Sequence, residues 1–161
     1  MIHQPNLSFV LGHPARLIAF GFGAGLAPIA PGTFGTLVAI PLAYALRYVV
    51  NDAFYIVLLP LWFALGVWAC GRTGRELGEH DYGGLVWDEV VAFMMILVFV
   101  PMTWVAQTIA FLLFRFFDIV KPPPARTVDR HWHSGLGVML DDIIAAFYTL
   151  LVFALWQRFL G

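Results

Sequence analysis

The chain has 161 residues, of which 61% are hydrophobic and only 12% are charged, and its formal net charge is -1. Soluble globular domains average ~45–50% apolar and ~25% charged residues, so this composition excludes a soluble domain and indicates a single membrane-embedded domain over residues 1–161. Lys121 is the only lysine and Cys70 the only cysteine, which excludes a basic surface for nucleic acid, an intrachain disulfide and a multi-thiolate metal site.

The N-terminal part of the chain is followed by a glycine- and proline-rich segment. Residues 1–16 contain two prolines and no basic cluster ahead of an apolar core, so we expect no cleaved signal peptide. In residues 21–37, glycine and proline predict a tight turn before a helix, with Thr33 as the N-cap. The free N–H groups of such a first turn suit a phosphate, whereas close helix packing in the membrane is the alternative role for this segment.

Four nearly uncharged stretches approach the ~20 residues that a helix needs to cross a bilayer. They cover residues 33–50, 53–70, 90–114 and 143–157. A segment in hydrocarbon must satisfy its own backbone hydrogen bonds, and the alternating pattern of a β-barrel is missing from these stretches. The predicted fold is therefore an all-α, multi-pass helical membrane protein.

The third stretch is either one tilted helix or a helical hairpin, because Pro101 lies near its middle and removes a backbone donor. Basic residues favour the cytoplasmic flanks of spans. A hairpin at residues 90–117 puts seven basic residues on one side and two on the other, whereas a single crossing gives no bias. We therefore predict the hairpin, although arms of 12 or 13 residues reach only ~18–20 Å against a core of ~30 Å.

Acidic residues gather at the ends of the predicted spans. Asp88 and Glu89 precede the third stretch, Asp118 follows it, and Asp141 and Asp142 open the last. The hairpin brings all five carboxylates to the same, cytoplasmic side. Like charges repel there and ionisable groups are costly at membrane depth, so the group needs a compensating cation. Oxygen ligands without thiolates suit a hard ion such as Mg²⁺.

Two simpler interpretations compete with a metal site. Acids in a first helical turn complement the helix dipole, which would explain both acidic pairs if helices begin there. Asp118 lies at a predicted helix C-terminus, where the dipole disfavours an anion, but Arg115 and Lys121 are close enough in sequence to pair with it. Ionisable residues beside spans also mark permeation paths, so a small ion-conducting or transport protein is a rival from another class.

Four blocks of sequence, in order, resemble the phosphatidylglycerophosphatase A family. They are GLAPIAPGTFGTL at 25–37, HDYGGLVWDEVV at 80–91, FRFFDIVKPPP at 114–124 and GLGVMLDD at 135–142. Thr36 stands where serine is common in that family. The resemblance implies a Mg²⁺-dependent phosphatase of the bacterial inner membrane, with its active site facing the cytoplasm. Its phospholipid substrate would be phosphatidylglycerophosphate, which loses its terminal phosphate to give phosphatidylglycerol, and another lipid phosphate is the alternative substrate.

Two sets of residues make up the resulting site hypothesis. The carboxylates expected to hold one or two Mg²⁺ ions and to carry the reaction are Asp88, Glu89, Asp118, Asp141 and Asp142. The residues expected to bind the phosphate are Gly32, Thr33, Gly35, Thr36, Arg115 and Lys121. The attacking group is either a water activated by the metal or one of the aspartates, and the sequence leaves both open.

Overall fold

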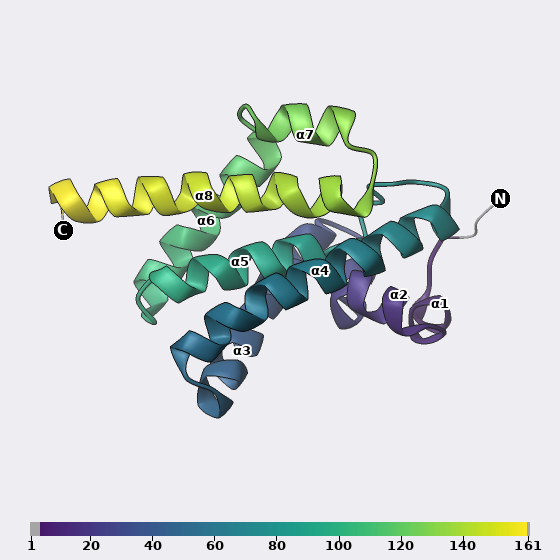
Figure 1. Ribbon diagram of the computed structural model, residues 1–161, viewed down its shortest axis with the longest axis horizontal. Coiled ribbons are helices and arrows are strands. Elements are labelled where there is room, and N and C mark those ends of the chain that lie inside the picture. Colours follow the sequence, from purple (N-terminus) through teal and green to yellow (C-terminus); the bar gives the residue numbers. More distant parts are fainter. Residues whose placement is uncertain (1–3, 161) are drawn as a thin grey trace.

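The computed structural model describes residues 4–160, and it contains helices but no strand within that range. In chain order, the elements are α1 (Leu7–Leu11), α2 (Pro14–Ala19), the 3-10 segment η1 (Gly21–Leu26), α3 (Pro31–Val49), α4 (Asp52–Leu77), α5 (Trp87–Phe99), α6 (Trp104–Val120), α7 (Ala125–His131) and α8 (Gly135–Leu160). Figure 1 shows α8 running along the long axis of the molecule and α4 running obliquely to it. The prediction of an all-α fold is confirmed.

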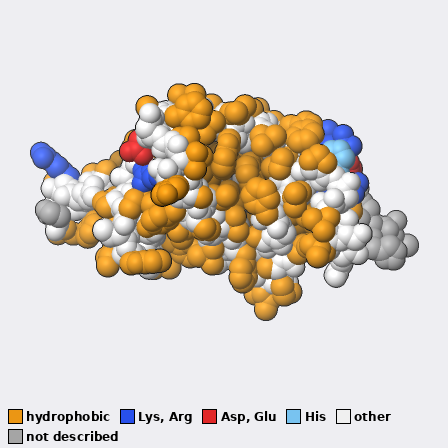
Figure 2. Space-filling model, turned by 90° about the horizontal axis from the view of Figure 1, so that it is seen from below, with side chains coloured by type: hydrophobic (Ala, Val, Ile, Leu, Met, Phe, Trp, Pro, Cys, Tyr) orange, Lys and Arg blue, Asp and Glu red, His pale blue; other side chains and the backbone are white. Residues whose placement is uncertain are grey.

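Three of these helices, α3, α4 and α8, are long and apolar enough to cross a membrane. The 26 residues of α4 and of α8 correspond to about 39 Å at 1.5 Å per residue, more than the ~30 Å of a hydrocarbon core. Figure 2 shows a broad band of hydrophobic side chains with most charged side chains at the two ends of the long axis. This distribution is the one expected of a chain that spans a bilayer.

The third predicted stretch forms a hairpin of two helices, as expected. α5 ends at Phe99 and α6 begins at Trp104, where the Thr103 side chain accepts a hydrogen bond from the Ala106 amide. Phe93 of α5 packs on Phe114 of α6 with ring centroids 5.8 Å apart, so the two arms lie side by side. The short α5 is tolerated because it packs against α3, α4 and α8 and is mostly buried among them.

The two longest helices extend well beyond their uncharged stretches. α4 continues to Leu77, and α8 starts at Gly135 instead of near residue 143. Gly135 permits this early start, because a Cβ there would collide with the Val67 carbonyl and lie 2.9 Å from the Gly71 Cα. The first two turns of α8 are therefore held by glycine contacts with α4, which a hydropathy pattern does not reveal.

The N-terminal segment packs against the bundle and supports the start of α5. The Val86 amide donates to the Ala19 carbonyl at 2.8 Å, and Arg16 Nε donates to Glu76 Oε2 of α4 at 2.8 Å. The predicted turn is present in η1, where Phe22 and Gly23 have positive φ angles of 60° and 103°. This packing fixes the segment that leads into the acidic residues of α5.

Candidate active site

The five predicted carboxylates meet at one end of the bundle. Two sets, Asp88 with Asp141 and Asp142, and Glu89 with Asp118 and Asp142, each offer carboxylate oxygens that lie within 4.8 Å of one another. Asp142 belongs to both sets, so the five side chains form one group, here called the acid cluster. Its members come from the start of α5, the end of α6 and the second to third turn of α8.

Several oxygens of the acid cluster are buried and lack a protein partner. Asp88, Asp141 and Asp142 are only 6%, 5% and 2% exposed. Within residues 4–160, Asp88 Oδ1, Glu89 Oε2 and Asp142 Oδ2 are buried and accept no hydrogen bond. Because leaving a buried carboxylate oxygen without a partner is costly, these atoms are suited to bind a ligand. A set of carboxylate oxygens without thiolates fits the preference of Mg²⁺.

Two cations partly balance the acid cluster. Arg115 forms an ion pair with Asp118 Oδ2, as the spacing predicts, and its Nη1 lies 3.6 Å from Glu89 Oε1. Lys121 does not pair with Asp118. Its Nζ donates instead to Asp141 Oδ2 of α8 at 2.5 Å. Lys121 follows the last residue of α6 and has a left-handed backbone, so its side chain does not continue the helical spacing from Asp118. When all five carboxyl groups are ionised, these two cations leave a net negative charge that a further cation can balance.

Lys121 is held in its protonated form by its neighbours. Burial alone would lower the pKa of this amine, but the carboxylates of Asp141 and Asp129 outweigh that effect and raise the pKa above its usual value. The side chain therefore carries a positive charge at neutral pH, as a phosphate-binding group requires.

The helix dipole explains only part of the acid cluster. Asp88 and Glu89 lie in the first turn of α5, where the dipole favours anions. Asp141 and Asp142 do not lie in a first turn, because α8 already begins at Gly135. The dipole interpretation is therefore wrong for the α8 pair, which needs a different compensating charge.

The start of α3 differs from its prediction. Thr33 is not the N-cap, because the helix begins at Pro31 and its N-cap is Ala30. The backbone of Ala30 is left-handed (φ 48°, ψ 54°), and its methyl side chain makes no capping hydrogen bond. Pro31 favours this earlier start because its fixed φ is already helical and its missing N–H needs no partner in the first turn. Thr33 is the third residue of the helix, and its amide donates to the Ala30 carbonyl at 2.9 Å.

Gly32 brings the first turn of α3 against the acid cluster. A Cβ at this position would collide with the Glu89 carboxylate and would lie 3.1 Å from two nitrogens of the Arg115 guanidinium. Only glycine permits this approach, which aims the positive end of the α3 dipole at the site. The predicted proximity of the glycine-rich segment to the carboxylates is therefore present at Gly32.

Gly35 and Thr36 make packing contacts instead. A Cβ at Gly35 would lie 2.6 Å from Val86, and the buried Thr36 hydroxyl donates to the Gly32 carbonyl at 2.8 Å. With Ala39 and Ala43 they belong to the buried, small-residue face of α3, and α3 packs on α5. Gly35 and Thr36 therefore serve close helix packing, which was the alternative role expected of this segment. Their contacts lend no support to a phosphate-binding role.

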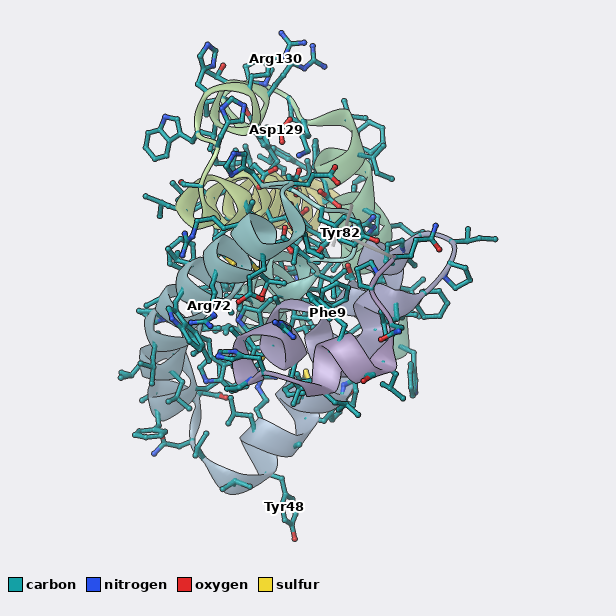
Figure 3. The ribbon with its side chains drawn as sticks, turned by 90° about the vertical axis from the view of Figure 1, so that its right-hand side faces the viewer. Phe9, Tyr48, Arg72, Tyr82, Asp129 and Arg130 are labelled. Atoms are coloured by element: carbon teal, nitrogen blue, oxygen red, sulfur yellow. The ribbon has the colours of Figure 1, made fainter. Side chains whose placement is uncertain are left out.

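One neighbour of the site was absent from the sequence-based hypothesis. Asp129, on α7, accepts a hydrogen bond from Lys121 Nζ at 2.8 Å. The sequence signal that points to it is its place in the short polar segment between two blocks that carry cluster carboxylates. Figure 3 looks onto this end of the molecule, with Asp129 on the inner side of α7 and Arg130 on its outer side.

Comparisons with known proteins identify relatives of the chain. The sequence profile of the phosphatidylglycerophosphatase A family matches residues 17–157. A phosphatidylglycerophosphatase A from Haemophilus influenzae is 39% identical over 151 residues, or 93% of both chains, and one from Escherichia coli is 41% identical over 138 residues, or 84% of this chain and 78% of that protein.

A third relative carries a different name. It is a protein from Bacteroides thetaiotaomicron with the provisional name of a phosphatidylinositol-3-phosphatase, 36% identical over 152 residues, or 90% of this chain and 94% of its own. No solved structure matches the chain.

Proposed function

The chain belongs to the phosphatidylglycerophosphatase A family, and from this premise we propose that its acid cluster is the centre of a Mg²⁺-dependent removal of the terminal phosphate of phosphatidylglycerophosphate. The products are phosphatidylglycerol and inorganic phosphate. The observation that carries the proposal is the set of unpartnered, buried carboxylate oxygens of Asp88, Glu89 and Asp142 beside the first turn of α3. It is the place where a metal ion and a phosphate would both find partners.

The position of the acid cluster suits a lipid phosphomonoester. The cluster lies at one end of helices whose middle is apolar. A phospholipid places its acyl chains beside such an apolar middle and its phosphate at the membrane boundary. Substrate and carboxylates would then meet at the same depth without any part of the headgroup entering the hydrocarbon.

The residues that would hold Mg²⁺ are the two sets that share Asp142. Asp88 and Asp141 complete one set, and Glu89 and Asp118 complete the other, which allows one or two ions. When bound, the ion supplies positive charge to the phosphate oxygens and lowers the pKa of a water.

The chain's own cations and amides would hold the phosphate in place. The protonated Lys121 and the Arg115 guanidinium both border the acid cluster, and Gly32 brings the positive end of α3 to it. These groups would fix the oxygens of the phosphate for in-line attack. A carboxylate of the cluster would either accept a proton from the attacking water or attack phosphorus itself. In both cases the bond from phosphorus to the glycerol oxygen would break and phosphatidylglycerol would leave as the alcohol after that oxygen takes up a proton. In the second case water would then hydrolyse the aspartyl phosphate to release inorganic phosphate.

We place the protein in the bacterial inner membrane with the acid cluster on the cytoplasmic side. The basic residues support this orientation. Arg72 pairs with Glu76 near the C-terminal end of α4, and Lys121 pairs with Asp141 in the acid cluster. Arg47 lies at the opposite end, where it pairs with Asp52 and donates to the Val98 carbonyl. The excess of basic residues on the cluster side is typical of a cytoplasmic face.

Phosphate release by the detergent-purified protein tests this function. We expect turnover of phosphatidylglycerophosphate that EDTA abolishes. We expect Asp142→Asn to lower kcat by ~10²-fold or more, because this variant loses a ligand to an ion that would supply several kcal/mol of charge stabilisation. Asp52→Asn is the matched control, since Asp52 is exposed and lies at the other end of the molecule.

Activity of Asp142→Asn at the wild-type level would contradict the assignment. Parallel assays with phosphatidic acid and phosphatidylinositol 3-phosphate test the substrate. We expect the highest kcat/KM for phosphatidylglycerophosphate. A higher kcat/KM for one of the other two lipids would identify that lipid as the preferred substrate instead.

A further inference from the structure

Lys121 is held from two sides by carboxylates of different helices. Its Nζ donates to Asp129 Oδ1 of α7 at 2.8 Å and to Asp141 Oδ2 of α8 at 2.5 Å. Within residues 4–160 it donates no other hydrogen bond to a side chain. Asp141 belongs to the acid cluster, whereas Asp129 lies outside it and has no part in the chemistry described above.

The backbone at Lys121 is unusual for its residue type. Lys121 ends α6 with its backbone in the left-handed region, at φ 48° and ψ 66°. Residues other than glycine, asparagine and aspartate seldom adopt this conformation. A residue held in such a conformation at a functional site indicates that its surroundings fix it there. These surroundings include the two carboxylates that bind the side chain.

A single carboxylate would not define the position of this ammonium. Lysine carries a compact charge on a flexible four-carbon stem, and a pair with Asp141 alone leaves that stem free to change rotamer. A second acceptor on α7 restricts the ammonium to the place where both hydrogen bonds are made. α7 is itself fixed, since it packs on α8 and since Tyr148 of α8 donates to the Pro123 carbonyl just before α7.

We infer that Asp129 is a positioning residue, which holds the Lys121 ammonium against Asp141 at the edge of the acid cluster so that it is in place for the phosphate. The inference rests on the proposed function for the role of Lys121. The contact itself does not, because it is a property of the free protein.

Asp129 also borders a small cavity. This cavity of about 20 Å³ is lined by His80, Asp81, Asp129 and His133 among others, and its size suits a single water. The alternative to a positioning role is that Asp129 serves only to attach α7 to the rest of the bundle.

Because Lys121 is the only lysine, chemical acetylation of the full-length protein in detergent reads its position directly. Mass spectrometry gives the rate of modification of Lys121, with the N-terminal amine as the internal reference. We expect Asp129→Asn to raise that rate about tenfold, because the ammonium loses a charge-assisted hydrogen bond. Asp129→Glu keeps the charged acceptor and should retain most of the protection. Asp52→Asn, at the other end of the molecule, should behave as wild type.

Kinetics distinguish positioning from attachment of α7. We expect Asp129→Asn to lower kcat about tenfold with a small change in KM and in the temperature of unfolding, and Asp129→Glu to restore part of it. In a Lys121→Met background the same substitution should cause no further loss, because Asp129 acts through the amine. An equal loss of kcat in both backgrounds, or a wild-type acetylation rate in Asp129→Asn, would overturn the inference.

The two proposals fail in different ways. If Asp142→Asn retains full activity while Asp129→Asn exposes Lys121 to acetylation, the contact between Asp129 and Lys121 stands and the proposed function is wrong. If Asp142→Asn is inactive and the acetylation rate does not depend on Asp129, the proposed function stands and the positioning role is wrong.

Discussion

Gly32 is the residue at which the first turn of α3 meets the acid cluster. Gly32→Ala would place a methyl group against the Glu89 carboxylate and the Arg115 guanidinium. Overpacking of this kind costs about 1–3 kcal/mol, and we expect most of it at the site, as a fall in kcat of about tenfold or more. The measurement is phosphate release at saturating lipid, together with the temperature of unfolding.

Gly83→Ala is the matched control for that substitution. A Cβ at Gly83 meets no atom within 4 Å, although this residue also lies in the segment that precedes α5. We expect its kcat to stay within twofold of wild type, since an exposed substitution without contacts has little effect. A wild-type kcat for Gly32→Ala would show that the start of α3 does not approach the reacting phosphate.

At the scale of single residues, the sequence predicts which carboxylates gather but not how each is balanced. The five acids were identifiable because each lies at the end of an apolar stretch, where an ionisable side chain is costly unless it has a compensating partner. The ion pair of Arg115 with Asp118 follows from helical spacing. The partners of Lys121 do not, because its left-handed backbone at the end of α6 sends the side chain to α7 and α8.

At the scale of elements, the start of α8 depends on a contact between glycines. Gly135→Ala would place a Cβ 2.8 Å from the Gly71 amide nitrogen and in collision with the Val67 carbonyl. We expect a loss of about 1–3 kcal/mol of stability, because backbone atoms on α4 move less readily than side chains. Thermal unfolding in detergent measures it.

Gly71→Ala offers a comparison across the same contact. A Cβ at Gly71 would lie 3.4 Å from Gly135, at the limit of ordinary van der Waals contact, so its effect should be clearly smaller. An equal unfolding temperature for Gly135→Ala and wild type would mean that α8 does not begin where the structure has it.

The hairpin and the start of α8 show what charge and hydropathy patterns do and do not reveal about elements. Charge asymmetry on the two sides predicts the turn near Pro101, and the structure has it between Phe99 and Trp104. Hydropathy places the start of the last helix near residue 143, two turns late, because it reports contact with lipid. The first turns of α8 contact α4 and α7 instead, and the short α5 avoids the length problem by being buried among other helices.

At the scale of the whole molecule, the distribution of charge favours an enzyme at a membrane boundary over an ion pathway. Among residues 4–160, the charged side chains that are buried are Asp88, Asp141 and Asp142, and all belong to the acid cluster. An ion pathway would have carboxylates along the apolar middle as well, whereas the other buried polar side chains in this range are the uncharged Thr36, Thr73, Gln107 and Thr149. The wide hydrophobic band in Figure 2 separates the charged ends.

Labelling of single cysteines tests the orientation of the protein in the membrane. Single cysteines at Asp81→Cys and Ser134→Cys lie in loops at the cluster end, and Asn51→Cys lies in the turn between α3 and α4 at the other end. Cys70 is fully buried and contributes no background. In right-side-out vesicles, a membrane-impermeant maleimide should modify Asn51→Cys alone, because the side with more basic residues faces the cytoplasm. Inverted vesicles should give the reverse pattern, and modification of Ser134→Cys in right-side-out vesicles would place the acid cluster outside the cell.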